Sequence, residues 1–118
     1  MTAHSDDFHA ALQVLVGAGA VKQRLVDAYR QHLASLREQD LPDAVRDRFT
    51  RLRTAMHEAP AAGGMSAPEA SARKMSEKDA AAHATAILEM FAVLSALNDS
   101  DSAPRLRIVP NIDDTLTD

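Results

Sequence analysis

Residues 41–59 read LPDAVRDRFTRLRTAMHEA, and this stretch decides the fold class. Its apolar side chains recur at steps of three and four residues, which places them on one face of a helix. The members of this stripe are Leu41, Val45, Phe49, Leu52, Met56 and Ala59. The stretch therefore predicts an amphipathic helix over 41–59 whose apolar face packs against other elements of the chain.

A longer helix is predicted on the N-terminal side of this stretch, over residues 6–38. Acidic residues open it at Asp6, and apolar side chains follow at helical spacing from Phe8 onward. Gly17 and Gly19 lie in its middle, and each costs about 1 kcal/mol relative to alanine in a helix interior. We expect one long, kinked helix, with a break near Gly17 as the alternative.

The C-terminal half of the chain predicts a third helix over residues 76–97. Ser76 followed by Asp79 is a variant of the capping box that opens it. Before it, residues 60–75 combine prolines, Gly63-Gly64 and no periodicity, which is typical of a flexible linker. After it, residues 99–118 are net acidic and contain prolines, so we expect an extended or disordered acidic tail.

These elements predict an all-α fold. A chain of 118 residues supports one hydrophobic core, so we expect a single domain over residues 1–98. The short connection near residue 40 favours an antiparallel pairing of the first two helices. The predicted architecture is a small antiparallel bundle of three helices, or of four if the first breaks near Gly17.

The composition excludes several classes of chemistry. The chain has no cysteine, which rules out disulfides, thiolate zinc sites, iron–sulfur clusters and cysteine nucleophiles. It also lacks a Gly-x-Ser-x-Gly elbow, a Gly-x-Gly-x-x-Gly turn and a phosphate-binding P-loop. We therefore predict no catalytic residue, no cofactor and no metal ligand set, and expect a non-enzymatic protein.

Charge disfavours nucleic acid and membrane partners. Thirteen basic and 17 acidic residues give a net charge of −4, so no overall field attracts polyanions. The most apolar stretch, residues 8–21, is shorter than the roughly 20 residues that span a bilayer. It follows Asp6 and Asp7 rather than the basic residues of a secretory signal. We expect a cytoplasmic protein that does not bind membranes.

The predicted N-terminal helix carries more apolar surface than one neighbour can cover. A helix that is apolar on several sides must be buried by several neighbours. We therefore expect an interaction surface at Phe8, Leu12, Leu15 and Val16. A second copy of the chain, as a homodimer, or another protein would cover it. The alternative, that the third helix covers this face in a monomer, stays open.

Two other functions remain as alternatives to an interaction module. A small nucleic-acid regulator would use Arg46 and Arg53 as anion contacts on helix 41–59, although the interleaved acids and scarce aromatics oppose this. A small metal- or ligand-binding bundle would use Asp79 and His83, four residues apart. Two ligands alone do not define a metal site, and an exposed side-chain pair explains the same spacing.

Overall fold

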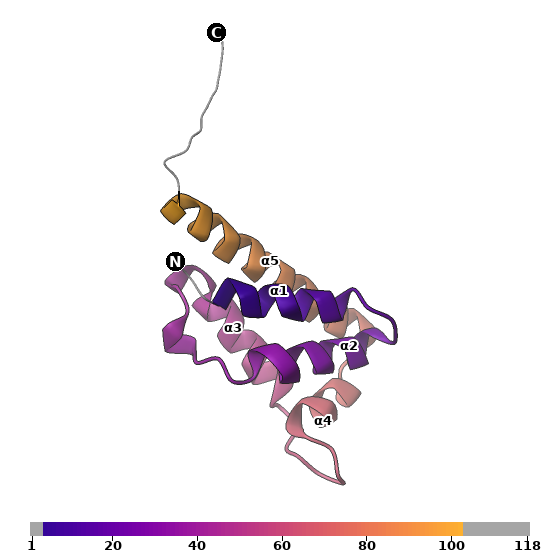
Figure 1. The fold of residues 1–118 in the computed structure, drawn as a ribbon. Coiled ribbons are helices and arrows are strands. Elements are labelled where there is room, and N and C mark those ends of the chain that lie inside the picture. Colours follow the sequence, from indigo (N-terminus) through magenta and orange to yellow (C-terminus); the bar gives the residue numbers. More distant parts are fainter. Residues whose placement is uncertain (1–3, 103–118) are drawn as a thin grey trace.

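A computed structural model describes residues 4–102 of the chain, and side chains over residues 4–97. This part of the chain is helical, so the predicted all-α class is confirmed (Figure 1). Its five α-helices are α1 (His4–Leu15), α2 (Val21–Ala28), α3 (Asp43–Met56), α4 (Ala67–Lys74) and α5 (Glu77–Ser102). A π-helical turn over Tyr29–Leu33 continues α2, and a 3-10 turn over Glu38–Asp40 precedes α3.

The prediction of one long helix over residues 6–38 is wrong, because α1 ends at Leu15 and α2 begins at Val21. Gly19 has a φ of +107°, a conformation that glycine adopts far more easily than other residues. Arg24 reaches back from α2 and donates through Nε to the carbonyl of Gly19 at 2.9 Å and through Nη1 to that of Leu15. Its guanidinium thus satisfies carbonyls at the end of α1. The chain reverses here, so α1 and α2 lie side by side in opposite directions (Figure 1).

The predicted flexible linker over residues 60–75 contains a helix, α4, which corrects that prediction. Ser66 and Glu69 form a capping box: the Ser66 Oγ accepts from the Glu69 amide at 3.3 Å, and the Glu69 Oε1 accepts from the Ser66 amide at 2.9 Å. Pro68 lies in the first turn, where it costs no hydrogen bond. The cap and the proline start a helix that the small side chains of this segment do not reveal by periodicity.

The other two predicted helices agree with the structure to within a few residues. The helix predicted over 41–59 corresponds to α3, and the helix predicted over 76–97 corresponds to α5. Helix α5 continues to Ser102, so the predicted tail does not begin at residue 99. Residues 103–118 of that tail lie outside the described part of the chain. The described part of the chain contains five α-helices of 8 to 26 residues rather than the predicted three or four.

One hydrophobic core joins the helices. Phe8 of α1 meets Phe49 of α3 edge to face, with ring centroids 6.2 Å apart. Helix α5 packs against α1, α2 and α3, and α4 packs against α2 and α3. The largest fully buried side chains come from four helices and two connections. They are Phe8, Leu25, Tyr29, Leu33, Leu41, Val45, Phe49, Leu52, Met56, Ile87, Met90 and Leu94.

Because the chain breaks between α1 and α2, substitution of Gly19 should change the free energy of unfolding in the opposite direction from that expected for a continuous helix. Gly19→Ala should lower the free energy of unfolding by about 1 kcal/mol, because the side chain disfavours a positive φ. In an unbroken helix the same change would raise it by about 1 kcal/mol. Urea denaturation followed by circular dichroism measures the sign. A stabilised variant would contradict the break.

Candidate functional site

The structure places the four residues predicted as an interaction surface in different environments. Phe8 is fully buried and Leu15 is only 7% exposed, so both belong to the core of the single chain. The prediction that they face a partner is therefore wrong, because the break lets α2 and the other helices cover them. Leu12 is half-buried against the core, whereas Val16, just after the end of α1, is 80% exposed.

Helix α5 carries the apolar surface that the chain leaves uncovered. By length and composition alone, its segment Glu77–Leu97 is apolar enough to cross a membrane, yet only 22% of its most apolar window is buried. Leu88 is 52% exposed, and the other exposed residues around it are mostly small. Those neighbours are Ala81, Ala82, Thr85, Ala92 and Ala96. Between Asp79 and the end of this segment, the exposed charged residue is Glu89. Figure 1 shows the C-terminal part of α5 extending past the other helices.

The edge of α1 lies beside this face of α5. The imidazole of His9 contacts the ring of Phe91, with centroids 5.6 Å apart. Helices α1 and α5 run in roughly opposite directions (Figure 1). Leu12, one turn after His9, and Leu88, one turn before Phe91, therefore lie along the same side of the helix pair. We call Leu12, Val16, Leu88 and Phe91 the α1–α5 apolar surface.

Both arginines predicted as anion contacts are used inside the chain. Arg46 donates through Nε to the Glu38 carbonyl at 3.1 Å, through Nη2 to the Leu41 carbonyl at 2.8 Å and through Nη1 to Asp43 at 2.6 Å. Two of its donors are thus occupied by carbonyls of the turn that precedes α3, and a third by the first residue of α3. The guanidinium of Arg46 is therefore a cap for that turn rather than a free anion contact.

Arg53 has a similar structural role. Its Nη2 donates to the carbonyl of Leu36, and its guanidinium carbon lies 5.1 Å from the centroid of the Phe49 ring. The Glu38 carboxylate is 4.0 Å from Nε, which is buried and has no hydrogen-bond partner within the described residues. Arg48 and Arg51 of the same helix remain exposed, whereas the two arginines predicted as anion contacts have partners within the chain.

The role of Arg53 can be tested by comparing it with its neighbour. Arg53→Ala should lower the free energy of unfolding by about 1–2 kcal/mol, because it leaves the Leu36 carbonyl without its donor and uncovers Phe49. Arg51→Ala removes the same charge from an exposed site and should change the free energy of unfolding by less than about 0.5 kcal/mol. Urea denaturation of both variants checks this. Equal effects would contradict the structural role.

The π-helical turn carries the single tyrosine of the chain. The amide of Ala34 donates to the carbonyl of Tyr29 at 2.8 Å, the spacing that defines a π-turn. The fully buried Tyr29 ring directs its hydroxyl to Nε2 of His57, 2.9 Å away at the end of α3. Burial raises the pKa of the Tyr29 phenol, an effect that the charge of Arg53 reduces and that of Glu38 increases.

This environment predicts how stability depends on alkaline pH. The pKa of the Tyr29 phenol is higher in the folded chain than in the unfolded chain, where it is about 10. The neutral phenol therefore contributes its full stabilisation below about pH 10, and this contribution is lost as the pH rises through the pKa of the folded chain. Tyrosinate absorbance should titrate above pH 10 in buffer and near pH 10 in concentrated urea. Tyr29→Phe should remove this part of the alkaline destabilisation. A folded-state midpoint at or below the urea midpoint would contradict the assignment.

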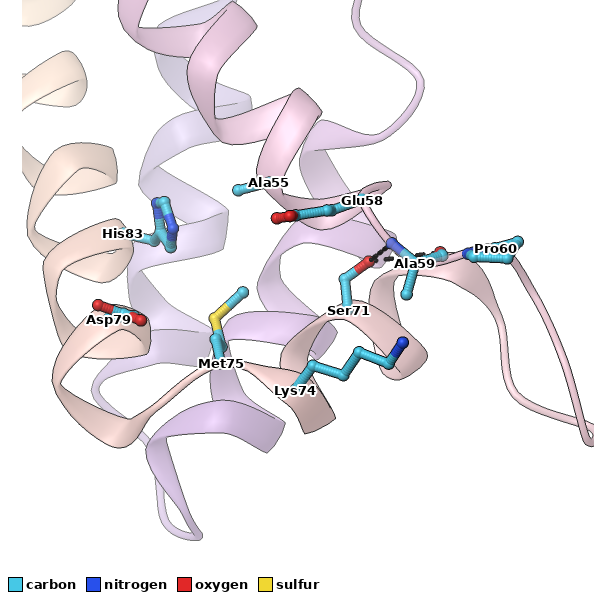
Figure 2. Close-up of a pocket in the computed structure, with 9 residues that line it drawn as sticks. All are labelled: Ala55, Glu58, Ala59, Pro60, Ser71, Lys74, Met75, Asp79 and His83. Carbon is cyan, nitrogen blue, oxygen red and sulfur yellow. Dashed lines mark hydrogen bonds between the residues drawn. The ribbon is translucent and has the colours of Figure 1, made fainter.

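A cavity of about 420 Å³ lies between the end of α3, α4 and the start of α5 (Figure 2). Its lining includes the charged and imidazole side chains of Glu58, Lys74, Asp79 and His83. Ser71, only 4% exposed, fixes its wall: the hydroxyl accepts from the Ala59 amide at 2.9 Å and lies 3.4 Å from the Ala59 carbonyl, to which it donates. This serine fastens α4 to the end of α3.

The pair singled out for a metal or ligand site, Asp79 and His83, lines this cavity. Figure 2 shows both on the α5 side, facing the carboxylate of Glu58 across the opening. Within residues whose side chains are described, no group of three or more histidine or acidic side chains is close enough together to hold a metal ion.

Sequence reasoning found Asp79 and His83 but missed the other polar residues of the cavity. Lys74 and Ser71 lie in the segment interpreted as a linker, so the sequence did not predict that they lie near α5. The Ser66–Glu69 capping box with Pro68 was the signal that α4 begins there. Leu88 lies within the predicted helix 76–97, and periodicity alone does not tell which side of such a helix remains uncovered.

Comparison with known proteins gives no match among protein-family models, curated proteins or solved structures.

Proposed function

We propose that this protein is a non-enzymatic helical interaction module that forms a homodimer through the α1–α5 apolar surface. The observation that carries the proposal is Leu88, which is 52% exposed on a face of α5 whose other exposed side chains are mostly alanines. Exposed apolar side chains that lie next to one another on one face mark interaction sites. The proposal keeps Leu12 and Val16 from the sequence prediction and replaces Phe8 and Leu15 with Leu88 and Phe91.

The properties of the surface favour a second copy of the chain as the partner. A twofold pair brings the same surface of each copy together, so a charged face would oppose itself. Over residues 84–97, Glu89 is the sole acidic or basic side chain, so two such faces meet with little repulsion. The alanines flanking Leu88 allow two helices to approach closely, and an antiparallel pairing aligns their dipoles favourably.

A bilayer is a poorer occupant of this surface than a protein. Ala80, Ile87, Met90 and Leu94 of α5 are buried in the core, so the helix would have to leave the bundle to span a membrane. The carboxylate of Glu89 would then lie within the hydrocarbon, at a cost of about 3 kcal/mol. Both arguments support association between folded chains.

The homodimer can be tested by substitution at the centre of the exposed face. Light scattering should give a solution mass of twice 12.7 kDa for the full chain. Leu88→Glu should reduce it to the mass of one chain, because two carboxylates would be buried in an apolar contact. Circular dichroism should show unchanged helix content, since Leu88 is already half-exposed.

The matched control is Thr50→Glu, which places the same charge on an exposed position of α3. This variant should keep the mass of the dimer. A full chain that stays monomeric at every protein concentration measured, or a Leu88→Glu variant that stays dimeric, would overturn the proposal.

A further inference from the structure

The cavity between α3, α4 and α5 has a charge distribution that the proposed dimer does not use. Its volume, about 420 Å³, lies within the range typical of small-molecule sites. None of the side chains of Glu58, Lys74, Asp79 and His83 forms a hydrogen bond or ion pair with another described residue. By contrast, Asp40, Asp43 and Glu69 elsewhere in the chain each pair with an arginine. The polar groups around the cavity are therefore free to bind a ligand.

The charges are separated across the cavity. Figure 2 shows Asp79 and His83 on one side, with the carboxylate of Glu58 directed toward them. The Lys74 side chain extends the other way, toward Ala59 and Pro60. The lining thus presents two carboxylates at one end and one ammonium at the other. Met75 and Ala55 supply apolar surface between them.

We propose that this cavity binds a basic amino acid, which carries a cationic side chain, an α-ammonium and one carboxylate. The cationic side-chain end of the ligand would pair with Glu58 and Asp79, its carboxylate would pair with Lys74, and its α-ammonium would point to solvent. Amino acids with uncharged side chains carry their ammonium and carboxylate groups on one carbon, so no chain separates the two charges. A basic amino acid separates a guanidinium or ammonium group from its carboxylate by a methylene chain, and that chain fits the apolar part of the lining.

The ring of His83 adds a neutral group to the carboxylate end of the cavity. Neutral imidazole has one donor and one acceptor nitrogen, so it can accept a hydrogen bond from a guanidinium. The walls are held in place by Ser71, which ties α4 to Ala59, so the site does not require a fold change on binding. Because the charged groups are exposed to solvent, each ion pair should contribute a small factor to affinity.

The probes are arginine and argininamide, which differ only in that the amide replaces the carboxylate. We expect saturable binding of arginine to the full chain by NMR titration, with shifts at the end of α3, in α4 and at the start of α5. Arginine should bind about three- to fivefold more tightly than argininamide, the factor of one exposed ion pair. Nonspecific attraction to an acidic chain gives the opposite order, because argininamide carries the larger positive charge.

Three variants assign the two ends of the site. Lys74→Ala should remove the preference for arginine, and Asp79→Asn should weaken both probes. Glu77→Gln is the matched control, since it also removes an acid from the first turn of α5 but does not line the cavity. It should leave binding unchanged, and so should Leu88→Glu, which separates this test from that of the dimer.

Several results would overturn the proposal. These are a titration that does not saturate, argininamide binding as tightly as arginine, and a loss of affinity in Glu77→Gln equal to that in Asp79→Asn.

Discussion

Helix α5 is longer than each helix that packs against it in the described part of the chain, and this constraint shapes the rest of the molecule. Its 26 residues extend about 39 Å at a rise of 1.5 Å per residue. The helices that pack on it have 12, 8 and 14 residues, because the chain breaks after Leu15 and turns back at Gly19. A short α1 covers one part of α5 and leaves Leu88 and its small neighbours uncovered. The same break that buries Phe8 thus creates the surface proposed for dimerisation.

Short helices also explain how the arginines are used. The C-terminal end of each helix leaves backbone carbonyls without partners, and a fold with many such ends needs many donors. Arg24 serves the end of α1, and Arg53 serves Leu36 after the π-turn. Arg46 serves the turn before α3. A guanidinium suits this role because its planar fork donates to two acceptors at once. The basic residues that suggested anion binding are therefore largely structural.

The sequence predicts α3 and α5 well because their apolar stripes are long and regular. It predicts α1 and α2 poorly as a pair, since apolar spacing continues across Gly17 and Gly19 and tertiary capping by Arg24 decides the break. Helix α4 has small buried side chains, Ala70 and Ala72, which carry little periodic signal, although its capping box was present in the sequence. Asp79 and His83 attract attention in the sequence as a pair, but the cavity that they line is not predicted, because its other wall depends on α4.

The absence of cysteine allows a direct test of which surface meets its copy. Single cysteines at Thr85, Leu88 and Ala92 can be oxidised and scored for covalent dimers. A disulfide between equivalent residues forms only where their Cα atoms come within about 7 Å, close to a twofold axis. The account predicts efficient crosslinking at one or more of these α5 positions and none at Thr50→Cys on α3. Crosslinking that is absent from all three α5 positions, or as strong at Thr50→Cys, would contradict it.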